Sequence, residues 1–210
     1  MPRDASLRPR WLRLSARHPE QAYAEELELV AAVSKGDPEA CEAFVRRLLP
    51  TVRRVTRSLL SAGPEADDAA QISLMDLLAS ASNYAGRGSL EGWAQRIATR
   101  STLRWAKKER RVVERVRAQR KDSPPEEVTL RTEVLDSLPR PLEYYLDQLS
   151  EVQRTAVLLR FSIGHTIPEI AEITGAAVPT VKSRIQKGRD ELRRLVRRDL
   201  GIGVRHSEDR

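Results

Sequence analysis

The chain has 210 residues, a formal net charge of +7, 32% charged residues and only 4% aromatic residues. This composition argues against one large β-sheet core and favours small helical cores, and the positive charge predicts an anionic partner such as nucleic acid. A single cysteine, Cys41, excludes an intramolecular disulfide and a Cys-rich zinc site.

The first segment, residues 1–24, is basic and has no helical period. It also lacks the apolar stretch of a secretory signal, and no apolar run elsewhere reaches the length of a membrane span. We therefore expect a flexible extension at 1–24, a cytoplasmic location and no membrane insertion.

Helical period begins at Glu25 and stops at Gly36. Asp37 is a typical N-cap, and Pro38 follows it at the first helical position, so a second helix is expected there. A third helix is predicted from about Ala66. The apolar residues that recur along it are predicted to face the core: Ala69, Ile72, Met75 and Leu78.

A loop is predicted over residues 83–88 because of its Gly, Asn and Tyr content, and Ser89 is expected to cap a fourth helix that runs to about Arg117. Cations recur along that helix at steps of three and four residues. Such a stripe follows phosphates, although a solvated face of a structural helix is the plainer alternative. The stripe consists of Arg96, Arg100, Arg104, Lys107, Lys108 and Arg111.

Residues 118–140 contain consecutive prolines and are predicted to form a flexible linker. Helical period resumes over 141–198, with two capping-box sequences that begin at Ser150 and Thr166. A tail is expected at 199–210. The fold class that follows is all-α, with two small helical domains, residues 25–117 and 141–198, joined by the linker.

The strongest motif of the second domain is a helix-turn-helix. Ala171 permits close packing of its two helices, Gly175 allows a positive φ in the turn, and Val181 fills the core. Polar and basic residues of the second helix lie mostly off its apolar face, where they can meet bases and phosphates. The candidates for DNA contact are Thr180, Lys182, Ser183, Arg184, Lys187 and Arg189.

The second domain resembles region 4 of the extracytoplasmic-function sigma factors of bacterial RNA polymerase. The resemblance rests on the runs 149–154, 158–160, 167–173 and 178–184, together with Gly175. It implies that this domain reads the upstream promoter element as duplex DNA. The chain departs from the family pattern at Pro179, where glycine is usual.

The first domain resembles sigma region 2 in the run 36–40, in the acidic start of the third helix, and in the loop and fourth helix around Tyr84, Trp93 and Arg96. The resemblance implies that the third helix docks on core polymerase through Asp67, Asp68 and Gln71. It also implies that the loop and fourth helix capture the melted downstream element. The residues expected to do so are Asn83, Tyr84, Arg87, Arg96, Arg100, Arg104, Lys107 and Lys108.

The resemblance predicts a transcription initiation factor whose partners are core RNA polymerase and promoter DNA, with an anti-sigma factor as a further candidate. The sequence shows no metal-ligand spacing, phosphate loop or nucleophile–base pair, so we expect no enzymatic activity, cofactor, metal or small-molecule substrate. Two alternatives stay open. One is a helix-turn-helix regulator that binds DNA without polymerase; the other, suggested by departures at Ile72, Leu74 and Arg104, is a sigma-like decoy that has lost promoter melting.

Overall fold

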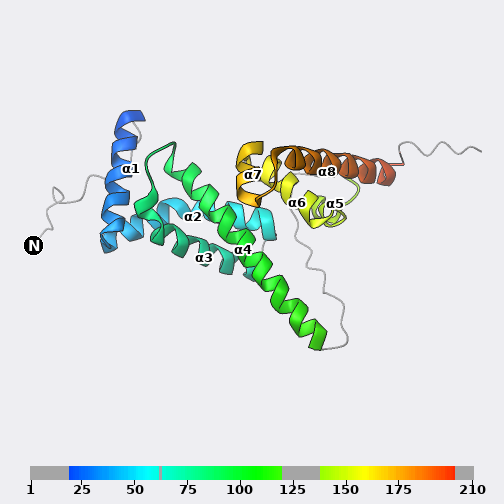
Figure 1. Ribbon diagram of the computed structural model, residues 1–210, viewed down its shortest axis with the longest axis horizontal. Helices are drawn as coiled ribbons and strands as arrows, with labels where there is room; N and C mark the ends of the chain where they lie inside the picture. Colours follow the sequence, from blue (N-terminus) through cyan, green and yellow to red (C-terminus); the bar gives the residue numbers. More distant parts are fainter. Residues whose placement is uncertain (1–18, 62, 120–137, 202–210) are drawn as a thin grey trace, which may run out of the picture. The chain divides into compact units, whose positions relative to one another are not determined.

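The computed structural model describes residues 19–61, 63–119 and 138–201, and every regular element in these ranges is a helix (Figure 1). The predicted all-α fold class is thereby confirmed. The chain divides into two compact units between Lys121 and Asp122. Most of the predicted extension, linker and tail lies outside the described residues.

The first unit is a helical bundle. Helices α2, α3 and α4 pack against one another, and α1 lies on α2 and on the short 3₁₀ helix η3. Its elements are α1 (Pro19–Ser34), α2 (Pro38–Leu60), α3 (Pro64–Ala79), η3 (Ala81–Asn83) and α4 (Leu90–Gln119).

The helix starts follow from local chemistry. The Asp37 carboxylate accepts a hydrogen bond from the Ala40 amide at 2.7 Å, which confirms the predicted cap of α2. Helices α1 and α3 begin at Pro19 and Pro64, earlier than the period of apolar residues predicted. Proline suits the first position of a helix because its φ is already helical and no intrahelical partner is needed for its nitrogen.

The core of the first unit contradicts one prediction. Helix α3 turns its small residues toward α2 and α4, whereas Ile72 and Met75, expected in the core, are 39% and 69% exposed. Small side chains allow the three helices to approach closely around Leu77, the one large buried side chain of α3, while Ile72 and Met75 occupy the outer face. The buried residues of α3 are Ala66, Ala69, Ala70, Ser73 and Leu77.

The second unit comprises α5 (Leu142–Asp147), α6 (Glu151–Leu158), the π-helical turn η4 (Leu159–Ile163), α7 (Ile167–Thr174) and α8 (Val178–Asp199). Both predicted capping boxes are confirmed, at the starts of α6 and α7. Gly175 ends α7 with φ +68°, in the left-handed region that the predicted turn required. Helices α7 and α8 therefore form the expected helix-turn-helix.

Gly188 lies where α8 crosses α6. It is buried, and a Cβ at this position would lie 2.7 Å from Val157 Cγ2 and 3.5 Å from Gln153 Cβ. Glycine in a helix interior costs roughly 0.5–1 kcal/mol relative to alanine. Here that cost is offset by the close contact between the two helices.

Replacing Gly188 with leucine is therefore expected to destabilise the second unit by about 2 kcal/mol, because overpacking a tight helix contact typically costs about 1–3 kcal/mol. Urea unfolding followed by far-UV circular dichroism measures the loss. All three tryptophans lie within the first 105 residues, so tryptophan fluorescence should report unchanged unfolding of the first unit. An unaltered circular dichroism transition would show that α6 and α8 do not need this close approach.

Candidate nucleic-acid interface

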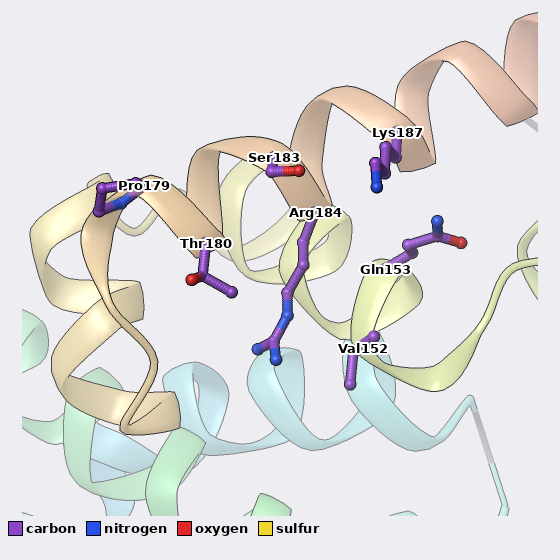
Figure 2. Close-up of a pocket in the computed structure, with 7 residues that line it drawn as sticks. All are labelled: Val152, Gln153, Pro179, Thr180, Ser183, Arg184 and Lys187. Atoms are coloured by element: carbon purple, nitrogen blue, oxygen red, sulfur yellow. The ribbon is translucent and has the colours of Figure 1, made fainter.

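The start of α8 forms one wall of a groove, and the start of α6 forms the other (Figure 2). Residues three and four apart on a helix share a face, so the polar residues 180, 183, 184 and 187 line the groove together. The lining residues are Val152, Gln153, Pro179, Thr180, Ser183, Arg184 and Lys187. Hydroxyl, guanidinium and ammonium groups all donate hydrogen bonds, which suits phosphate oxygens and the acceptor edges of bases.

The other two predicted contacts in α8, Lys182 and Arg189, do not line this groove. They are seven residues apart, so they share a second face of the helix. The Arg189 guanidinium lies over the ring of Phe161 in η4, 5.7 Å from its centroid. The structure thus separates the six predicted residues into a groove set of four and an edge pair.

Two groove residues, Val152 and Gln153, were not predicted. Gln153 is the second residue of the capping box predicted to begin at Ser150, and it accepts a hydrogen bond from the Ser150 amide at 3.2 Å. The sequence held a further signal in Gly188, since a glycine inside a helix often marks a close packing contact. That glycine brings α6 against α8 and so places Gln153 beside Lys187, as Figure 2 shows.

In the first unit, α4 carries the predicted cationic stripe outside its row of buried residues Ala94, Ala98 and Ser101, and Arg104 lies next to Ser101, to which its Nη2 donates at 3.2 Å. Of the five stripe cations expected to contact melted DNA, four are exposed and Arg100 is half-buried. Arg104 is also engaged with α3, because its Nη2 donates to Asp76 Oδ2 at 2.8 Å and Ser101 Oγ donates to the same oxygen. The remaining cations of this predicted set are Arg96, Lys107 and Lys108.

The last residue of η3, Asn83, and the loop between η3 and α4 hold the other predicted contacts to melted DNA. Asn83 and Arg87 are exposed, whereas Tyr84 is only 6% exposed. The Tyr84 ring packs against Trp93, with centroids 5.5 Å apart, and its hydroxyl lies 2.9 Å from Glu26 Oε2 and 2.8 Å from the Gly88 carbonyl. Tyr84 is therefore placed to support the loop, and Asn83 and Arg87 are placed to meet a ligand.

The three residues predicted to dock on polymerase, Asp67, Asp68 and Gln71, are all exposed on α3. Ile72 and Met75 lie on the same outer face, one turn farther along the helix. This face of α3, residues 67, 68, 71, 72 and 75, combines two carboxylates with two exposed apolar side chains. Such a combination is typical of a surface that binds another protein.

Two family models match the chain. Sigma-70 region 2 matches residues 44–112, and sigma-70 region 4 matches residues 140–192. The ECF RNA polymerase sigma factor SigM of Mycobacterium tuberculosis is 28% identical over 182 residues, which cover 86% of this chain and 89% of SigM. The chain belongs to the ECF sigma factors. It is accordingly a subunit of RNA polymerase that binds core enzyme and DNA, and it has no enzymatic activity of its own.

Other relatives of the sigma factor agree. The ECF RNA polymerase sigma factor SigE of Mycolicibacterium smegmatis is 30% identical over 154 residues, which cover 72% of this chain and 60% of SigE. The sigma factor RpoE of Bartonella quintana, solved with the anti-sigma factor NepR, matches with a TM-score of 0.57 and 26% identity over 76% of this chain and 95% of RpoE. CnrH, solved with the cytosolic domain of CnrY, shares the fold with a TM-score of 0.51 and 19% identity over 83% of this chain and 98% of CnrH.

Two negative findings apply to the part of the chain that the structure describes. No three His, Cys, Asp or Glu side chains are grouped so as to hold a metal ion. No helix in that part combines the length and the apolar character that crossing a bilayer requires.

Proposed function

We propose that this sigma factor divides promoter recognition between its two units. The second unit, assigned to residues 141–198, reads the upstream element as duplex through the groove of α6 and α8. The first, assigned to residues 25–117, holds the melted downstream strand with α4 and the loop before it. The observation that carries the proposal is the gathering of Thr180, Ser183, Arg184 and Lys187 in one groove directly after the helix-turn-helix turn.

The first unit has a second task in this proposal, which is to dock on core polymerase through the outer face of α3. Two carboxylates, at positions 67 and 68, lie on this face, and that of Asp67 also stabilises the start of α3 because it lies in the first turn, near the positive end of the helix dipole. Their exposure leaves them accessible to a basic partner, and Ile72 and Met75 supply apolar area beside them. Because bacterial RNA polymerase acts in the cytoplasm, the proposal includes a cytoplasmic location for this chain.

The test is run-off transcription with core bacterial RNA polymerase on a library of randomised promoters. We expect discrete, sequence-selected transcripts only when core enzyme and the sigma factor are both present. Neither DNA contact need be strong alone, because polymerase fixes their spacing and raises the effective concentration of the second contact. A chain that binds duplex tightly by itself and elutes apart from core polymerase would instead be the helix-turn-helix regulator considered above.

An anti-sigma partner is a second proposal, supported by the similarity to RpoE, which was solved with the anti-sigma factor NepR. A protein that silences this chain would have to cover the outer face of α3 or the groove of α6 and α8. We expect a protein that co-purifies with the native chain to compete with core polymerase for it. Simultaneous binding of both would contradict this role for that protein.

A further inference from the structure

A buried network joins α1 to the loop that precedes α4. Glu26, on α1, is only 7% exposed. Its Oε1 accepts a hydrogen bond from Arg47 Nη2 on α2, and Arg47 Nε donates to Glu91 Oε1 on α4 at 2.7 Å. The other oxygen, Oε2, lies 2.9 Å from the Tyr84 hydroxyl and 3.2 Å from the Leu90 amide nitrogen.

Both ends of the loop are thus hydrogen-bonded to the same oxygen atom, Glu26 Oε2. Tyr84 opens the loop, and Leu90 is the first residue of α4, where backbone amides lack partners within the helix. A carboxylate from another helix thus supplies an acceptor for the start of α4, at the end where the helix dipole favours negative charge. The loop between these two residues comprises only five residues, 85–89.

Two glycines and a tyrosine further constrain the path of the loop. Gly86 and Gly88 adopt positive φ values of +68° and +93°. The phenol of Tyr23, also on α1, covers Gly86 so closely that a Cβ there would lie 2.2 Å from its oxygen. Between the two glycines, Arg87 remains exposed. Helix α1 therefore holds the loop in a shape that presents Arg87 outward.

The protonation and charge of the groups in this network also favour its hydrogen bonds. Burial, and then the hydrogen bond with Glu26, raises the pKa of Tyr84 above its ordinary value. The phenol consequently stays protonated, and its hydroxyl can donate a hydrogen bond to Glu26 or to the Gly88 carbonyl. Arg47 supplies the positive charge that a buried carboxylate needs.

We propose that Glu26 is a positioning residue for promoter opening, which holds loop 85–89 ready to receive an unpaired base. The inference rests on the proposed function, because it assumes that the loop contacts melted DNA. Preorganisation improves binding since the loop need not be ordered when the base arrives. Tyr23 and Glu26 precede the residues matched by the region 2 family, 44–112, so the family match does not assign this role.

The test uses holoenzyme and measures base preference. Open-complex formation is determined for a promoter selected by the wild-type holoenzyme and for each single-base variant of its downstream and upstream elements. The main variants are Tyr84→Phe, which keeps the ring on Trp93 and removes only the hydroxyl, and Glu26→Gln. The matched control is Glu42→Gln, which breaks an exposed ion pair with Arg46 within α2 of the same unit.

We expect Tyr84→Phe and Glu26→Gln to reduce discrimination between downstream bases by about fivefold or more, the effect of losing one net hydrogen bond. Upstream discrimination and affinity for core polymerase should stay at the wild-type value, as they should in Glu42→Gln. If Glu26→Gln fails to fold, Tyr84→Phe decides alone.

The outcomes separate this inference from the function on which it rests. Arg87→Ala tests the loop itself: unchanged downstream preference in that variant would refute the loop's contact with DNA. If Arg87→Ala alters the preference and Tyr84→Phe does not, the positioning role is wrong and the loop's function stands. A parallel loss of downstream preference, upstream preference and core affinity would mean that Glu26 only stabilises the bundle, which also overturns the proposal.

Discussion

Replacing Ile72 and Met75 together by aspartate is expected to lower the affinity for core polymerase by more than about a hundredfold, since each apolar side chain buried in an interface contributes roughly 1.5–3 kcal/mol. Both side chains are exposed in the free protein, at 39% and 69%. Substitution should therefore change the stability of the bundle by less than about 1 kcal/mol. Fluorescence anisotropy of labelled sigma factor titrated with core enzyme measures the affinity.

Val112→Asp is the matched control, because Val112 is another exposed apolar residue of the same unit, 43% accessible on α4. It should leave core affinity unchanged, whatever it does to DNA binding. Equal losses in the control and the double variant would indicate a general effect of added negative charge. Unchanged affinity in the double variant would show that polymerase docks elsewhere than on the outer face of α3.

The same face of α3 shows why burial was mispredicted there. Helical period correctly indicated a helix, and hydrophobicity then assigned Ile72 and Met75 to the core. The structure instead buries three alanines, one serine and Leu77, because three helices meet closely on that side. A sequence pattern ranks side chains by their apolar character, but it does not contain the distance between neighbouring helices or the surface of a partner that is another molecule.

Local signals succeeded because their partners are near in sequence. The cap at Asp37 needs only the amide of Ala40, and the turn at Gly175 needs only its own backbone angle. Tyr84 is the contrasting case. Its partner Glu26 lies 58 residues earlier. The family resemblance therefore assigned Tyr84 to melted DNA, whereas in the fold its ring packs on Trp93 and its hydroxyl bonds to Glu26.

The α8 contacts fall between these two cases. The sequence identified a polar and basic helix after a helix-turn-helix turn, and helical spacing alone separates the faces of Lys182 and Lys187. Which face opens into a groove depends on α6, whose position is set by the close contact at Gly188. The types of residue that could contact DNA were therefore predictable from the sequence. Which of them line the groove could be seen only from the packing of α6 on α8.

The groove position of Arg184 and Lys187 can be tested with two double variants of α8. Replacing Arg184 and Lys187 by alanine should reduce transcription that depends on the upstream element by about thirtyfold or more, because each side chain bound to a base or a phosphate contributes about 1–3 kcal/mol. The dependence on salt should also become shallower, since a sigma factor that neutralises fewer phosphates releases fewer counterions on binding. Run-off transcription by holoenzyme, on promoters with the selected and a scrambled upstream element, measures the effect at several salt concentrations.

The matched control is Arg193→Ala with Arg194→Ala, which removes the same charge from the same helix. Both arginines pair with acidic residues of α8, at 3.4 Å to Asp190 for Arg193 and at 2.9 Å to Glu191 for Arg194. Neither lines the groove, so the control should retain most upstream-dependent transcription. Equal losses of upstream-dependent transcription in the two double variants would mean that α8 binds DNA only through its overall positive charge. A greater loss from replacing Lys182 and Arg189 than from replacing Arg184 and Lys187 would place the duplex against the opposite edge of the helix, because the two pairs lie on different faces.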